Sequence, residues 1–174
     1  MGARHYNAAW GGDAGLKAQR PWEFASPRDY NGHGTHTAST AGGNHDVELT
    51  GPAGIFGSIS GMAPRARISV YKALWSTQDG SLASGFTSAI VAAIDQAVAD
   101  GVDVINLSVQ GTQFNFFDPA QIAFLFAADA GIFGVTRFLG TDQGTTLEHV
   151  SHNGPNNPNP ASIDPVVIFR RFFV

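Results

Sequence analysis

Residues 31–43 read NGHGTHTASTAGG, a run of small and polar side chains around His33 and His36. The run predicts a loop leading into a closely packed helix, with His33 at the head of that helix. Gly34 leaves room beside the imidazole, and the helix N-terminus disfavours a permanent positive charge on it. A histidine in this setting is suited to taking up and returning a proton. His33 is therefore a candidate general base.

Strand and helix patterns alternate along the chain after this run. They predict, in order, a strand at 67–74, a helix at 87–100, a strand at 102–109, a helix at 118–130 and a strand at 132–135. Gly101 and Gly131 follow the two helices, where a left-handed residue is favoured. Residues 1–30 and 42–61 show no such period. Alternating strands and helices indicate an α/β fold, and continuously apolar strands indicate a doubly wound, mainly parallel sheet.

The last forty residues break this regularity. Residues 153–165 are crowded with Asn and Pro and predict an irregular or disordered stretch. Residues 166–174 read VVIFRRFFV, an apolar tail for which the sequence shows no sheet partner. We therefore separate an α/β body, residues 1–135, from an irregular C-terminal segment, residues 136–174.

Composition excludes several classes of protein. The chain has 174 residues, enough for one domain with a sizeable core, and its net charge of −4 gives no basic footprint for nucleic acid. The absence of cysteine excludes structural disulfides, thiolate zinc sites and a cysteine nucleophile. No apolar run is long enough to cross a membrane, and residues 1–13 lack the apolar core of a signal peptide. Composition does not indicate an oligomeric state.

Four segments resemble those of the subtilase family, the subtilisin-like serine peptidases. They are NGHGTHTASTAGG, GMAPRARISVYKAL, DGVDVINLSVQG and AFLFAADAGIF, and they follow one another in the order found in that family. The resemblance covers residues from about 28 to 134 and is strongest to the larger secreted members that carry a protease-associated insert. It implies that residues 1–135 are the central part of a subtilisin-like catalytic domain, which would be incomplete in this chain.

The resemblance also implies roles for individual residues. His33 matches the general base of the family, and His36 matches a second histidine with a structural role. Ser108, Val109 and Gln110 match the strand end that binds an extended polypeptide substrate by adding it as a strand. Gln110 stands where the family commonly has glycine, which would narrow or polarise the wall of the substrate pocket. No cofactor and no metal are expected.

The sequence departs from the family pattern at the other catalytic positions. No D-T-G-type segment precedes His33: Asp13 lies in GGDAG without an apolar strand before it, and Asp29 is too close in sequence. No G-T-S-x-A nucleophile segment follows Ser108. The segment with the oxyanion asparagine is also missing, and a frameshift around residues 134–144 is one hypothesis for its loss.

The resemblance therefore implies a fragment of a secreted serine endopeptidase that carries the general base and is inactive by itself. Two alternatives remain open: a truncated product without function, and a remnant that binds peptides along residues 108–110 without cutting them. A metal site at His33 and His36, with His45 nearby, is a third, although the sequence identifies no further ligand. Asn106 is expected to be a buried polar residue that bonds local backbone, and no catalytic role is assigned to it.

Overall fold

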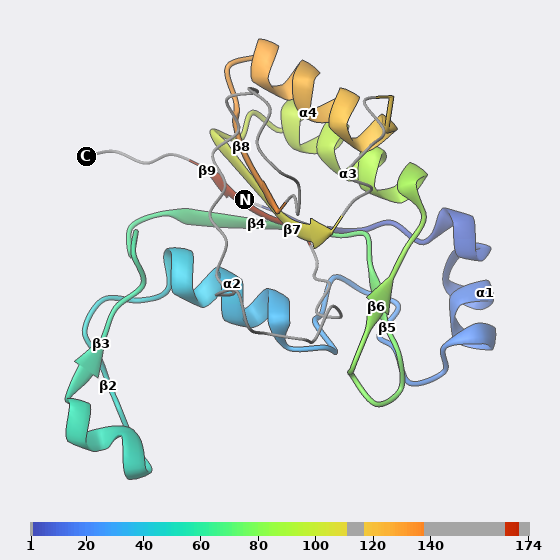
Figure 1. The fold of residues 1–174 in the computed structure, drawn as a ribbon. Coiled ribbons are helices and arrows are strands. Elements are labelled where there is room, and N and C mark those ends of the chain that lie inside the picture. The colour runs from blue at the N-terminus through green and yellow to red at the C-terminus, as the bar shows by residue number, and fades with distance from the viewer. Residues whose placement is uncertain (1, 111–116, 138–165, 171–174) are drawn as a thin grey trace.

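The structure is a computed structural model that describes residues 2–110, 117–137 and 166–170 (Figure 1). Its strands are β1 (Ala3–His5), β2 (Val47–Glu48), β3 (Ser58–Ile59), β4 (Arg67–Lys72), β5 (Trp75–Ser76), β6 (Ala83–Ser84), β7 (Val104–Gln110), β8 (Phe133–Arg137) and β9 (Val166–Arg170). Its α-helices are α1 (Gly12–Gln19), α2 (His33–Gly42), α3 (Thr87–Ala99) and α4 (Pro119–Asp129). The 3₁₀ helices are η1 (Ala8–Trp10) and η2 (Gly51–Phe56).

The main sheet has five strands in the order β1-β4-β9-β7-β8. Strand β1 is parallel to β4, with Ala3 opposite Val70, and β7 is parallel to β8, with Val104 opposite Phe133. Strand β9 lies between these two pairs and is antiparallel to both of its neighbours. The α/β class is therefore confirmed. The doubly wound, mainly parallel order is not established, because the central strand runs against the others.

Helices cover both faces of this sheet. Helix α2 packs against β4 and β9 on one face, and α3 and α4 pack side by side on the other (Figure 1). The buried side of α3 consists of Ala89, Ala93, Ile94 and Ala97. Three of these are small, so the helix can lie close to its neighbours, which a row of larger side chains would prevent.

Helix α4 buries less of its apolar surface than the sequence suggests. Asp118 caps it by accepting a hydrogen bond from the Ala120 N–H at 2.8 Å, and Pro119 occupies the first turn. Phe124 is 3% exposed, but Leu125 and Phe126 are 67% and 66% exposed. Only one side of the helix therefore contributes to the core.

The predicted strands and helices after residue 66 are confirmed, with bounds that differ by a few residues. Residues 1–30 contain β1 and α1, which the sequence did not predict. The apolar tail also differs from expectation, because residues 166–170 form β9 and pair with β4 and β7. The stretch predicted to be irregular, residues 153–165, lies outside the described residues, as does most of the proposed frameshift region.

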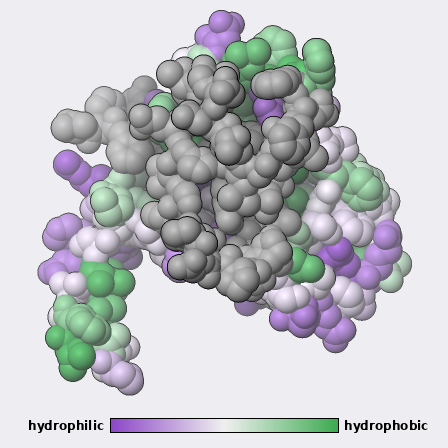
Figure 2. Space-filling view, in the orientation of Figure 1, coloured by the Kyte–Doolittle hydropathy of each residue, from purple (hydrophilic) through white to green (hydrophobic). Residues whose placement is uncertain are grey.

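Residues 47–62 form an arm that projects from the body (Figure 1). Strands β2 and β3 pair in it, around η2. Figure 2 shows apolar surface on the arm. Its exposed large apolar side chains are Val47, Ile55, Phe56, Ile59 and Met62. Gly61 lies against the end of α2: a Cβ atom there would come within 2.2 Å of the Gly43 nitrogen. This close contact requires glycine, and it joins the arm to the helix that begins with His33.

Candidate active site

His33 is the first residue of α2, and the turn before it is held by Asp29. Gly32 precedes the helix with a φ of 99°, a left-handed value that favours glycine. Asp29 accepts hydrogen bonds from the Gly32 N–H at 2.9 Å, from the Thr35 N–H at 2.9 Å and from the Thr35 hydroxyl at 2.6 Å. Its carboxylate thus satisfies backbone donors on both sides of His33, which is half-buried.

The charge of Asp29 is favoured by these contacts. Burial acts to raise the pKa of the carboxyl group, but hydrogen bonds from the Thr35 hydroxyl and from the Gly32 and Thr35 amides outweigh it. The positive charge of Lys72 acts in the same direction as the hydrogen bonds. The pKa of Asp29 is therefore held below its ordinary value. A carboxylate at the N-terminus of α2 also interacts favourably with the helix dipole.

The second histidine of the run is exposed on the same helix. The ring centroids of His36 and His33 are 6.4 Å apart, with the planes at 49°. The backbone of His36 takes part in the helix, since its carbonyl accepts from the hydroxyls of Ser39 and Thr40, each at 2.9 Å. In the described part of the chain, no group of three or more His, Cys, Asp or Glu residues is placed to hold a metal ion.

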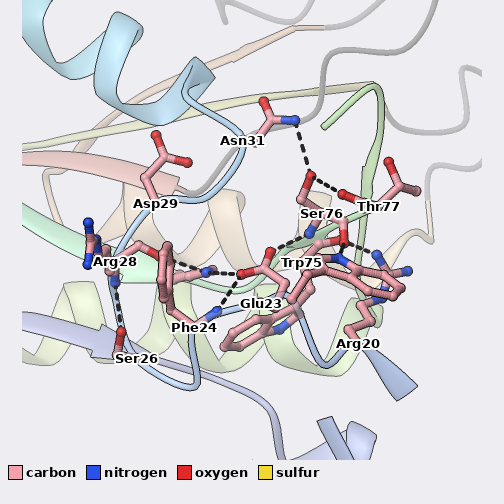
Figure 3. Close-up of polar contacts among 12 residues, drawn as sticks. Arg20, Glu23, Phe24, Ser26, Arg28, Asp29, Asn31, Trp75, Ser76 and Thr77 are labelled. Carbon is pink, nitrogen blue, oxygen red and sulfur yellow. Dashed lines mark hydrogen bonds and ion pairs between the residues drawn. The ribbon is translucent and has the colours of Figure 1, made fainter. Parts of the chain in front are cut away.

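The residues leading to His33 are docked onto the segment that follows β4. We call residues 20–31 the approach segment (Figure 3). Glu23 and Lys72 form an ion pair at 2.8 Å inside this contact, with side chains only 1% and 3% exposed. Glu23 also accepts from the Ser76 N–H at 2.5 Å, and Lys72 donates to the Arg28 carbonyl at 2.7 Å. Burial lowers the pKa of Lys72, while the hydrogen bond to Glu23 opposes that effect.

Further contacts run along the same interface. The Trp22 indole N–H donates to the Ser76 carbonyl at 2.9 Å, and the Tyr30 hydroxyl donates to the Gln78 carbonyl at 2.9 Å. Asn31, two residues before His33, donates to the Gly80 carbonyl at 2.6 Å. The approach segment is therefore fixed at its beginning, middle and end.

Asp13 has partners other than the α2 turn. It accepts hydrogen bonds from Asn7 at 2.6 Å and lies 3.2 Å from the His5 ring nitrogen. These side-chain hydrogen bonds, Asn7 first and His5 second, lower the pKa of Asp13. The structure thus places Asp13 beside His5 and Asn7.

The predicted substrate-binding residues lie at the C-terminal end of β7. The Asn106 amide donates to the Ser108 hydroxyl at 3.1 Å, a contact between side chains and not the bond to local backbone that the sequence predicts. The pairing of β7 with β9 covers only residues 104–106, and no described strand pairs with residues 108–110 on that side. The side chains of Val109 and Gln110 lie outside the described residues. Among described contacts, no hydrogen bond joins Ser108 to His33.

Sequence reasoning missed the residues that hold the α2 turn. The position of Asp29 in the sequence predicts that it is not the triad aspartate, but its hydrogen bonds to the first turn of α2 were not predicted. An Asp shortly before a run of helix-forming small residues is a usable signal for a cap. The sequence around Lys72 indicates an ion pair, because a lysine inside the apolar strand RISVYKAL needs a buried partner. Nothing in the sequence identified Glu23 as that partner.

Comparison with known proteins places these features in a family. Residues 3–137 match the Subtilase family, which is more than half of the chain. The chain belongs to the subtilase family. The matched range includes His33, the approach segment and β7, and it supports a subtilisin-like serine peptidase catalytic domain of which this chain carries part.

Three plant proteins illustrate the similarity. The chain is 50% identical over 148 residues to subtilisin-like protease SBT2.2, 44% over 140 residues to SBT2.1 and 46% over 149 residues to SBT1.6, all from Arabidopsis thaliana. These alignments cover 82%, 78% and 83% of this chain but only 15%, 16% and 17% of the relatives. This subtilase chain thus spans about a sixth of the length of the curated relatives it matches.

The cap gives a prediction for stability against pH. Replacing Asp29 with Asn removes the charge and one acceptor oxygen, so at pH 7 the free energy of unfolding should fall by about 1 kcal/mol. Because the pKa of Asp29 is lowered on folding, its contribution is present above about pH 4 and is lost as the pH falls through the folded value. Urea unfolding from pH 3 to pH 7 measures the difference between wild type and Asp29→Asn.

The matched control is Asp95→Asn, at an exposed position on α3. We expect this control to change stability little at any pH. A deficit in Asp29→Asn that stays constant from pH 7 to pH 3 would contradict the capping role.

Proposed function

We propose that residues 1–135 are the central part of the catalytic domain of a secreted, subtilisin-like serine endopeptidase, with His33 as its general base. The intact domain would have the doubly wound, mainly parallel sheet of the family. The observation that carries the proposal is the position of His33: it begins α2, inside the family match, at a turn fixed by Asp29 and the approach segment.

In this role, His33 accepts the proton of a serine hydroxyl as the oxygen attacks a peptide carbonyl. It then gives the proton to the leaving amine. The serine nucleophile and the orienting aspartate have no recognisable segments in the 174 residues, so in the proposed enzyme they come from outside them. The chain contributes the base and the structure that holds it.

The substrate is a polypeptide in extended conformation. We place it along Ser108, Val109 and Gln110, where an added strand would bond to the backbone. The end of the β7–β9 pairing at residue 106 supports this, because it leaves one side of that segment without a described strand. The Gln110 side chain would make the pocket wall more polar than a glycine does.

Secretion of the parent enzyme is inferred from the family resemblance. Among the described residues, no helix is both long and apolar enough to cross a membrane. The proposal requires no cofactor, metal or nucleic acid.

The proposed function gives a prediction for the isolated chain. Without a nucleophile, it should show no peptidase activity and no labelling by a fluorophosphonate probe, because loss of the serine alone removes catalysis by on the order of 10⁶-fold. The His33→Ala variant is the control. Labelling that disappears in His33→Ala would show that the chain contains an active nucleophile and would overturn this prediction.

A chimera tests the role of His33. Residues 3–135 replace the aligned segment of SBT2.2, which is 50% identical to this chain and supplies the rest of the protease. We expect peptidase activity that His33→Ala lowers by roughly 10⁴-fold or more, since a general base and its nucleophile act as a unit. His36→Ala, on an exposed side chain of the same helix, should cost less than tenfold. Equal losses in both variants would contradict the assignment.

A further inference from the structure

Burying the charges of Glu23 and Lys72 costs the fold desolvation free energy. Both side chains are almost fully excluded from solvent, at 1% and 3% exposure. Such pairs often stabilise a protein no better than apolar side chains of the same size, because both charges lose their hydration. Retention of the pair therefore needs another explanation, and its remaining contacts provide one.

The ammonium of Lys72 reaches beyond its carboxylate partner. It donates to the Arg28 carbonyl at 2.7 Å and lies 4.4 Å from the centre of the Trp75 ring. Arg28 immediately precedes Asp29, whose carboxylate binds the amides of Gly32 and Thr35. Two successive contacts therefore connect Lys72 to the turn that carries His33.

Glu23 fixes the opposite side of the same turn. One carboxylate oxygen accepts from the Ser76 N–H at 2.5 Å, and the other accepts from Lys72 and from the Phe24 N–H at 3.1 Å. The Ser76 hydroxyl in turn lies 3.4 Å from the Asn31 amide, two residues before His33. The buried pair thus takes part in both of these connections between β4–β5 and the residues before α2.

We propose that Glu23 and Lys72 are positioning residues that set the place of His33 by clamping the approach segment. The proposal rests on the proposed function of His33 as a general base. The clamp acts through backbone groups, the Arg28 carbonyl and the Ser76 amide, so it restrains the path of the chain before His33.

The test uses the full 174-residue chain and the variant Glu23→Gln/Lys72→Met, which keeps the size of both side chains and removes both charges. Amide hydrogen exchange by NMR should become about tenfold faster at Gly32 and Thr35, because the cap loses its anchor. The ring signals of ¹⁵N-labelled His33 should shift. Exchange at Ile94 and Ala97 in the core of α3 should stay within twofold.

Arg4→Met/Asp100→Asn is the matched control, since it removes the ion pair between Arg4 and Asp100 at 2.9 Å, away from the approach segment. It should leave His33, Gly32 and Thr35 unchanged. If the first variant does not fold, Glu23→Asp, which keeps both charges and shortens the reach of the carboxylate, should give a milder form of the same pattern. Unchanged His33 signals in a folded variant, or equal shifts in the control, would overturn the proposal.

The two proposals fail in different ways. An inactive chimera whose His33 still responds to Glu23→Gln/Lys72→Met would refute the proposed function and keep the clamp. An active chimera in which the same double variant leaves kcat and the His33 signals unchanged would refute the clamp and keep the function. A positioning role predicts a lower kcat with KM nearly unchanged.

Discussion

The buried ion pair between Glu23 and Lys72 is the interaction on which the geometry around His33 depends. It joins two segments 49 residues apart in sequence, the approach segment and the end of β4. Leaving either charge alone in the interior would cost about 3–5 kcal/mol, so neither partner can be lost without the other. The pair therefore holds the chain before α2 against β4 and β5. Asp29 then connects this segment to the first turn of the helix through its hydrogen bonds to Gly32 and Thr35.

Helix α2 has little of its own to fix its position. Its residues are mostly small, and Gly34 is its one buried residue among those described. It rests on β4 and β9 and is joined at its far end to Gly61 and the residues after it. The position of α2 is thus set at its two ends. Asp29 and the approach segment hold the end before His33, and the close contact between Gly43 and Gly61 holds the end after Gly42. The histidine held in this way is half-buried.

Local sequence patterns predicted most of the strands and helices after residue 66. They did not predict contacts between residues far apart in the sequence. The strand at 67–74 and the helix beginning at Thr87 follow from period and capping, which are local properties. The run around His33 likewise identified the histidine and the family. The partner of Lys72 lies 49 residues away and has no periodic signal, and β9 obtains its place by pairing with strands far earlier in the chain. Such pairings depend on the assembled sheet.

A double-mutant cycle tests the central claim most directly, with Glu23→Gln/Lys72→Met taken together as one change and Asp29→Asn as the other. Urea unfolding at pH 7 gives the interaction free energy between the buried pair and Asp29. Because the pair and Asp29 restrain the same turn, we expect a coupling of about 1 kcal/mol or more. Effects that add to within about 0.3 kcal/mol would show that the buried pair and the helix cap are independent, and would contradict the account.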